Sequence, residues 1–138
     1  MIGIARAERT STARAEEFFA RWCDLGSHPE WAPSMEYFRP QDPFGIGARG
    51  VSRPRGGEEA SFVVTAVGPG AVYADRTELG GAELTVHHEA TPVDGGCVVV
   101  LRAWLEGPEA DGWSERLGDT VQRALERDLE SLALLLEG

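Results

Sequence analysis

The sequence predicts an α+β protein, in which a curved antiparallel sheet of about seven strands carries one long C-terminal helix across its concave face. Residues 2–9 alternate between apolar and polar side chains. Glycine-rich turn signals then recur at intervals of about 10 to 15 residues as far as residue 96. From residue 108 onward, apolar residues are spaced by three and four instead. Strands and helices segregated in this way along a chain are typical of the α+β class.

The N-terminal part predicts one strand followed by two short helices. The alternation over residues 2–9 is that of a half-buried strand. Over residues 12–23, aromatic residues at three- and four-residue spacing give a helix one apolar face, and acidic residues occupy its first turns. A second short helical turn is predicted over residues 28–31, where Pro29 stands near the first helical position.

The middle of the chain predicts six strands joined as antiparallel hairpins. Parallel neighbours would need a crossover of a dozen or more residues, and the turn signals leave no room for one. The clearest single turn is Asp94–Gly95, a pair that readily adopts positive φ in a hairpin. The predicted strands cover residues 34–40, 48–53, 59–67, 71–79, 82–91 and 97–106.

The last segment, residues 109–137, predicts one amphipathic helix about 40 Å long. Its apolar stripe runs without a proline interruption, and Gly118 weakens it locally. Placing this stripe on the concave face of the sheet buries the apolar side of both elements. The stripe consists of Trp113, Leu117, Val121, Leu125, Leu129, Leu132 and Leu136.

Composition narrows the classes of function. The 138 residues suit a single domain, residues 1–138, and the net charge of −10 argues against nucleic-acid binding. The chain has no Lys, which excludes Schiff-base chemistry on a lysine. The absence of Lys, together with abundant Arg, Ala and Gly, also suggests a GC-rich bacterial genome. No apolar run approaches the ~20 residues of a membrane span, and the N-terminus lacks a signal-peptide core. We therefore expect a cytoplasmic protein without membrane insertion.

Several loose motifs, in a fixed order, resemble the helix-grip (SRPBCC) superfamily, which includes START lipid-transfer domains, birch-pollen-type allergens and bacterial polyketide cyclase/dehydrase proteins. The resemblance covers nearly the whole chain, and it departs from the usual pattern at Cys97, where Thr is common. It implies a cavity between sheet and C-terminal helix that binds apolar molecules, with no metal or nucleotide cofactor. The matching residues are Ser11–Thr12, Phe18–Phe19, Asp24, Trp31–Pro33, Gly47 and Pro69.

Side-chain alternation indicates which residues would line that cavity. In the last strand, Leu101 belongs to a row without charge, so this row is placed inward, and the preceding strand carries His88 inward in the same way. These side chains would equally well pack a solid core, because lining and core residues look alike in sequence. The predicted lining residues are Trp31, Met35, Tyr37, Phe62, Val64, Val86, His88, Val99, Leu101, Ala103, Trp113, Leu117 and Val121.

Three polar residues are candidates for orienting a ligand or moving a proton: His88, Tyr37 and Arg76. His88 is either a hydrogen-bonded core histidine or a ligand contact. Arg76 faces inward only if its strand presents Val72, Ala74 and Arg76; the alternative row is Tyr73, Asp75 and Thr77. His87 and His88 point to opposite faces and cannot bind one metal ion together.

Three functions are consistent with these residues. The first is binding of a small hydrophobic molecule, a lipid or a polyketide-like compound, by a monomer or homodimer. The second is a polyketide aromatase/cyclase or dehydratase that uses the same pocket, with His88, Tyr37 and Arg76 acting on a carbonyl. The third is a protein-interaction module with Trp104 exposed on the outer face of the sheet.

Overall fold

The computed structural model describes residues 1–68 and 71–138 of the chain, and the expected proline turn at Pro69 lies outside the described residues. One seven-stranded antiparallel sheet runs in the order β1-β7-β6-β5-β4-β3-β2. Its strands are β1 (Ile2–Ser11), β2 (Met35–Pro40), β3 (Arg49–Pro54), β4 (Ala60–Gly68), β5 (Val72–Glu78), β6 (Glu83–Val93) and β7 (Gly96–Glu106).

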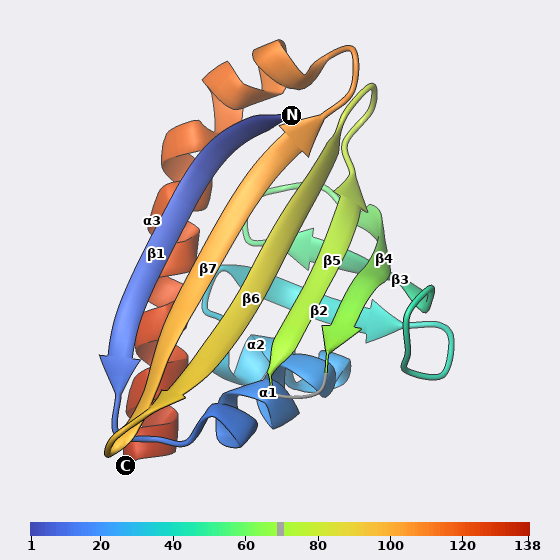
Figure 1. Cartoon of the computed structure of the whole chain (residues 1–138). Helices are drawn as coiled ribbons and strands as arrows, with labels where there is room; N and C mark the ends of the chain where they lie inside the picture. Colours follow the sequence, from blue (N-terminus) through green and yellow to red (C-terminus); the bar gives the residue numbers. More distant parts are fainter. Residues whose placement is uncertain (69–70) are drawn as a thin grey trace.

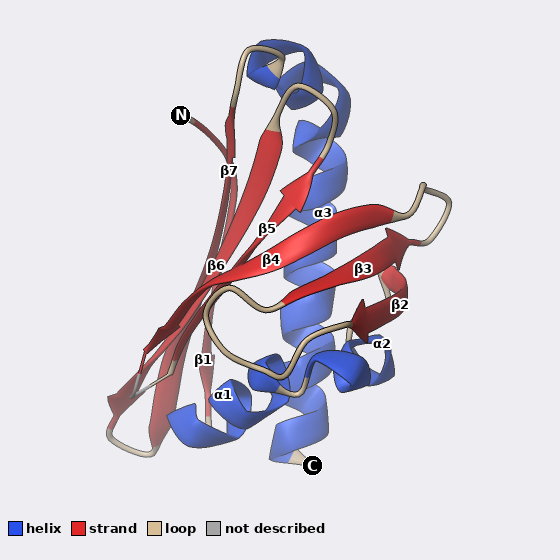
Figure 2. Ribbon diagram, turned by 90° about the vertical axis from the view of Figure 1, so that its right-hand side faces the viewer, coloured by secondary structure: helices blue, strands red, loops and turns tan. Residues whose placement is uncertain are grey.

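The helices are α1 (Ala15–Cys23), α2 (His28–Trp31) and α3 (Ala110–Glu137), with a 3₁₀ turn at Leu25–Ser27. The predicted element order and α+β helix-grip class are confirmed. Figure 1 shows α3 running along β1 and β7, while α1 and α2 cover one end of the sheet. In Figure 2, β2–β4 turn away from β6, β7 and β1, and α3 lies inside this bend.

Irregularities in the strand pairing decide which side chains face inward. The register shifts between Met35 and Tyr37 in β2 and between Val64 and Ala66 in β4. Because side chains alternate with a period of two, one extra residue reverses the faces of everything beyond it. Phe38, rather than Tyr37, therefore belongs to the buried core.

A close approach at Gly50 of β3 helps to place Phe62 in the interior. A Cβ atom at Gly50 would lie 2.5 Å from the Phe62 ring and 2.4 Å from the backbone oxygen of Arg39. Only glycine fits under the ring at this distance. The Phe62 ring, 3% exposed, stacks at 4.3 Å from that of Phe38.

The apolar stripe of α3 is buried unevenly. Leu125, Leu129 and Leu132, in its C-terminal half, are buried in the core. Burying side chains of this size contributes roughly 1.5–3 kcal/mol each. In contrast, the residues of the stripe between Ala110 and Val121 are only half-buried. The helix is thus a core element over part of its length only.

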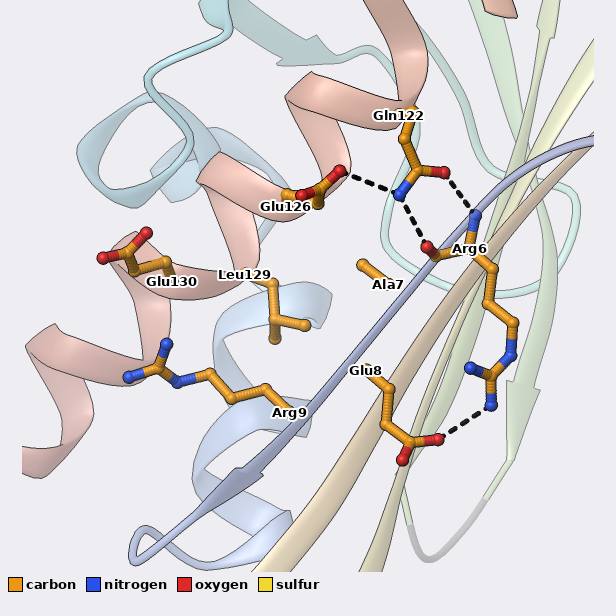
Figure 3. Close-up of a pocket in the computed structure, with 8 residues that line it drawn as sticks. All are labelled: Arg6, Ala7, Glu8, Arg9, Gln122, Glu126, Leu129 and Glu130. Atoms are coloured by element: carbon orange, nitrogen blue, oxygen red, sulfur yellow. Dashed lines mark hydrogen bonds and ion pairs between the residues drawn. The ribbon is translucent and has the colours of Figure 1, made fainter. Parts of the chain in front are cut away.

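Polar contacts fix α3, from its middle to its C-terminus, to the rest of the molecule. The Gln122 side-chain amide accepts a hydrogen bond from the Arg6 N–H and donates one to the Arg6 carbonyl, pairing with the free edge of β1 (Figure 3). The Asp128 carboxylate accepts from both the backbone N–H and the hydroxyl of Ser34. At the C-terminus the Ser11 hydroxyl donates to Glu137.

Candidate functional site

A cluster of aromatic and histidine rings fills the interior beneath α1 and α2. The His88 ring lies 5.2 Å from that of Trp22 and 5.3 Å from that of Tyr73. The His28 ring packs 4.4 Å from that of Phe38. Trp22 and Tyr73 are at most 1% exposed. At this end of the interior, the cavity expected between sheet and helix is occupied by side chains.

Both buried histidines are held neutral by their surroundings. The Nε2–H of His28 donates to the Trp22 carbonyl at 2.8 Å, and the Nδ1–H of His88 donates to the Tyr73 carbonyl at 3.1 Å. Burial lowers the pKa of His28 to about 4 and that of His88 to about 3. At neutral pH neither imidazole is in its protonated, cationic form, so neither can act as a general acid.

Next to this cluster, β5 presents a buried carboxyl group on the inner face. The Tyr73 hydroxyl donates to Oδ2 of Asp75 at 2.7 Å. Burial raises the pKa of Asp75 to about 6, although the bond from Tyr73 opposes this shift. Burial also raises the pKa of Tyr73 well above its usual value, so the phenol stays protonated. Asp75 is thus an acid whose proton exchanges close to neutral pH.

Asp75 marks the boundary between tightly packed and partly open parts of the interior. Its register partners are Val64 of β4, which is 1% exposed, and Val86 of β6, which is half-buried. One step further along the strands, Thr77 and Leu84 are also half-buried. The inward side chains of β5 and β6 are therefore packed less tightly from Asp75 toward the turn between these strands, while Leu105 of β7, the register partner of Leu84, is fully buried.

The N-terminal half of α3 lies at this looser end. The Trp113 indole N–H donates to the Gly80 carbonyl in the β5–β6 turn at 2.9 Å. Leu117 and Val121 follow on the same helical stripe, and Val121 packs against the core. A Cβ atom at Gly118 would meet nothing within 4 Å. Apolar side chains from helix and sheet therefore line this end while keeping part of their surface accessible.

Twelve of the thirteen predicted lining residues, all except Tyr37, divide into two groups by the extent of their burial. Seven are buried and five are half-buried. The buried ones are Trp31, Phe62, Val64, His88, Val99, Leu101 and Ala103. The half-buried ones are Met35, Val86, Trp113, Leu117 and Val121.

Tyr37 was wrongly placed inward. The bulge in β2 turns it to the outer face, where its hydroxyl donates to Glu59 and the Arg39 guanidinium lies 3.9 Å from its ring centre. Arg76 is also outside, because β5 presents the row that contains Tyr73 and Asp75. There Arg76 forms an ion pair with Glu83 at 2.5 Å. Of the three polar candidates, only His88 lies in the interior.

Sequence reasoning did not select Asp75, Tyr73 or His28 for this site. His28 begins α2, within the short helical turn predicted over residues 28–31, and its burial, at 5% exposed, was not predicted. The sequence did contain a signal for the orientation of β5. Tyr73 and Asp75 are two residues apart, so their side chains share one face and can form a hydrogen bond with each other inside the fold. An inward Arg76 would have needed a separate buried acid.

Two open hollows in the structure lie away from this region. One, of about 370 Å³, separates the β1 edge from α3 (Figure 3). The other, of about 430 Å³, lies over the outer face of β3, β4 and β5 and includes Arg49 and Arg76. Neither is lined by His88 or by Asp75. The first is lined by Arg6, Ala7, Glu8, Arg9, Gln122, Glu126, Leu129 and Glu130.

Other chemical groups of the interior have limited reactivity. The Trp31 indole N–H is enclosed and lacks an acceptor among the described residues. Burial raises the pKa of Cys23 to about 11 and also raises that of Cys97, so both thiols are protonated at neutral pH. No three His, Cys, Asp or Glu side chains of residues 1–68 and 71–138 are grouped to hold a metal ion. Over the same residues, no helix has the length and apolarity needed to cross a membrane.

A bent antiparallel sheet gripping a long C-terminal helix, with two short helices after the first strand, defines a helix-grip protein. The sequence matches the family described as polyketide cyclase / dehydrase and lipid transport over residues 4–137. The chain belongs to this family. Among curated proteins there is no match.

Solved structures show the same fold at low sequence identity. Protein MLL2253 from Mesorhizobium loti is 17% identical, with a TM-score of 0.75 over 96% of this chain and 95% of that one. Ara h 8.0201 is 14% identical, with a TM-score of 0.67 over 95% of both chains. The di-domain ARO/CYC StfQ from the steffimycin biosynthetic pathway is 12% identical, with a TM-score of 0.77; the match covers 99% of this chain and 51% of StfQ.

Proposed function

We propose that this protein binds a small, largely apolar molecule between the inner face of the sheet and the N-terminal half of α3. The observation that carries the proposal is the uneven burial of one helical stripe. Leu125, Leu129 and Leu132 are buried, whereas Leu117 and Val121 on the same stripe remain half-buried. Apolar surface that remains accessible inside a fold favours the binding of an apolar ligand.

The neighbouring side chains support this location. Val86 and Leu84 offer further half-buried apolar surface from β6. Trp113 is fixed to the β5–β6 turn and bounds the region at one end. The packed rings around His88 and Tyr73 bound it at the other. A guest placed here would cover apolar atoms of both sheet and helix without displacing the core.

The family supports the same proposal, since its description includes lipid transport. The structure of StfQ adds a relative in fold whose name refers to an aromatase/cyclase. Both activities require an apolar compartment, and a binding role is the simpler use of it.

Fluorescence titration with Nile red, an uncharged dye that lacks N–H and O–H groups, tests the proposal. We expect saturable binding to the wild type and at least about tenfold weaker binding to Leu117→Asp, because a charge on this surface must be desolvated when the dye binds. Leu134→Asp is the matched control: Leu134 is on the same helix but 56% exposed. Equal binding by both variants, or no binding by a folded wild type, would overturn the proposal.

A second candidate function is proton-transfer catalysis of the cyclase or dehydratase type. It is favoured by Asp75, a buried acid with a pKa of about 6 beside the proposed site. Tyr37 and Arg76 lie outside and take no part in it. Turnover of a poly-β-ketone substrate that disappears in Asp75→Asn, while Nile red still binds, would support catalysis; turnover unchanged in this variant would exclude Asp75 as the acid.

A further inference from the structure

We propose that Asp75 anchors the polar end of the ligand, so that the site selects apolar molecules bearing an O–H or N–H donor and rejects those with an anionic head. This inference rests on the proposed binding function and names the class of ligand. It concerns the headgroup alone and makes no statement about the apolar part.

Asp75 is positioned at one end of the proposed site. Asp75 lies on the inner face of β5, between Val64 and Val86, where the packed interior gives way to half-buried apolar surface. It is 7% exposed, so the residue is not completely sealed by its neighbours. A ligand lying along Leu84, Val86 and α3 would bring its end to this carboxyl group.

The Asp75 carboxylate has hydrogen-bonding capacity that the described residues do not use. A carboxylate offers about four acceptor positions on its two oxygens. Among the described residues, Tyr73 is the only hydrogen-bond donor to Asp75, and it reaches Oδ2. Buried carboxylates normally have their acceptor positions filled. The remaining positions of Asp75 suit a donor supplied by a ligand.

No cation of the described part of the chain acts on Asp75. Arg76, its neighbour in sequence, points outward and pairs with Glu83. Arg9 of β1 lies at the sheet edge, where Figure 3 shows its side chain extending toward Glu130. The sequence contains no Lys.

The titratable groups around the cluster do not supply a positive charge either. They are Tyr73 on β5, His88 on β6, His28 on α2 and Cys23 on α1, and each is neutral at pH 8. An ionised Asp75 therefore meets no opposing charge from any element packed against this region. A carboxylate or phosphate head would add a second buried negative charge, whereas an alcohol, phenol or ammonium group would donate to Asp75.

Displacement of Nile red at pH 8 by four compounds built on an unbranched ten-carbon chain tests this selectivity. The compounds are decan-1-ol, decylamine, decyl methyl ether and decanoate, which share one chain length and differ in headgroup. For the wild type we expect the alcohol and the amine to displace the dye at concentrations about tenfold or more below those of the ether and the carboxylate.

Asp75→Asn removes the charge and retains an oxygen that can accept from Tyr73. In this variant we expect decylamine to weaken about tenfold or more and decanoate to improve, while the ether is unchanged. Glu78→Gln, an exposed change on the same strand, should leave all four unchanged. Folding of each variant is checked by near-ultraviolet circular dichroism.

The outcomes separate this inference from the function on which it rests. If Nile red binds but the four compounds rank alike, or rank alike in wild type and Asp75→Asn, the headgroup proposal is wrong and apolar binding stands. If decanoate is the strongest competitor for the wild type, the charge argument fails. If Nile red does not bind the folded wild type, both proposals fail together.

Discussion

The Tyr73 hydroxyl and the Asp75 carboxylate, two residues apart on β5, form a hydrogen bond of 2.7 Å inside the protein. Their spacing places both side chains on the inner face, and both are at most 7% exposed. A single hydrogen bond compensates only part of the cost of burying a carboxylate. The pair is therefore destabilising when Asp75 is ionised, and this leads to measurable consequences.

Asp75→Asn should stabilise the protein above pH 7. The folded-state pKa of about 6 exceeds the ordinary value of 3.8, so the contribution of Asp75 to wild-type stability falls as pH rises between these values. The full difference corresponds to at most about 3 kcal/mol, which the neutral amide avoids. Urea unfolding at pH 8 and pH 4 should show a gain at pH 8 and almost none at pH 4. A loss at pH 8 would contradict the assigned burial cost.

Near pH 5, unfolding of the wild type should be accompanied by the net uptake of about one proton from solvent, summed over His28, His88 and Asp75. Unfolding frees His28 and His88, whose folded pKa values of about 4 and 3 lie below the ordinary 6.5, so each takes up a proton. Asp75 releases one proton in exchange. Stability is thus lost as pH falls below about 6.5.

In Asp75→Asn, the release of a proton by Asp75 no longer cancels part of the uptake by the two histidines. The slope of unfolding free energy against pH should therefore roughly double near pH 5. Each net proton contributes about 1.4 kcal/mol per pH unit. Denaturant titrations at half-unit steps from pH 4.5 to 6 measure both slopes. Parallel slopes for wild type and variant would show that Asp75 does not retain its proton in the folded state at pH 5.

Tyr37→Phe and Arg76→Ala should leave Nile red binding unchanged, because both side chains lie on the outer face of the sheet. The Arg76–Glu83 ion pair is partly exposed, and such pairs contribute about 0–1 kcal/mol. Dye titration and urea unfolding of both variants provide the measurement. A tenfold loss of affinity in either would place that residue back at the binding site.

Gly50→Ala should destabilise the protein by about 2 kcal/mol or more. The new methyl group would overlap both the Phe62 ring and the Arg39 carbonyl, and the backbone oxygen has no room to retreat. Gly26→Ala is a suitable control, since a Cβ atom there meets nothing within 4 Å. Equal thermal unfolding midpoints for the two variants would show that β3 adjusts freely.

The element order and most inward rows followed from periodicity and turn chemistry. The row containing Val99, Leu101 and Ala103 is buried as its alternation predicts. The errors arose where alternation breaks. The bulge between Met35 and Tyr37 reverses one strand, and a single extra residue leaves no mark in composition.

The candidate site was less predictable than the fold because it depends on contacts between distant segments. The burial of His28 results from packing against Phe38 and Tyr73, which follow it by 10 and 45 residues. The choice between Arg76 and Asp75 as the inward charge depends on a partner in space, and periodicity does not encode it. Tyr73 is that partner.

The contacts of α3 at Gln122, Asp128 and Glu137 fix the middle and the C-terminal part of the helix, and its first three turns extend beyond them. The N-terminal end of α3 is attached to the β5–β6 turn by the hydrogen bond from Trp113 to Gly80. Bending of α3 near Gly118 would move this end of the helix away from the sheet, while Leu125 and Leu132 would remain in the core. Such a bend would give a ligand access to the interior without disturbing the buried leucines.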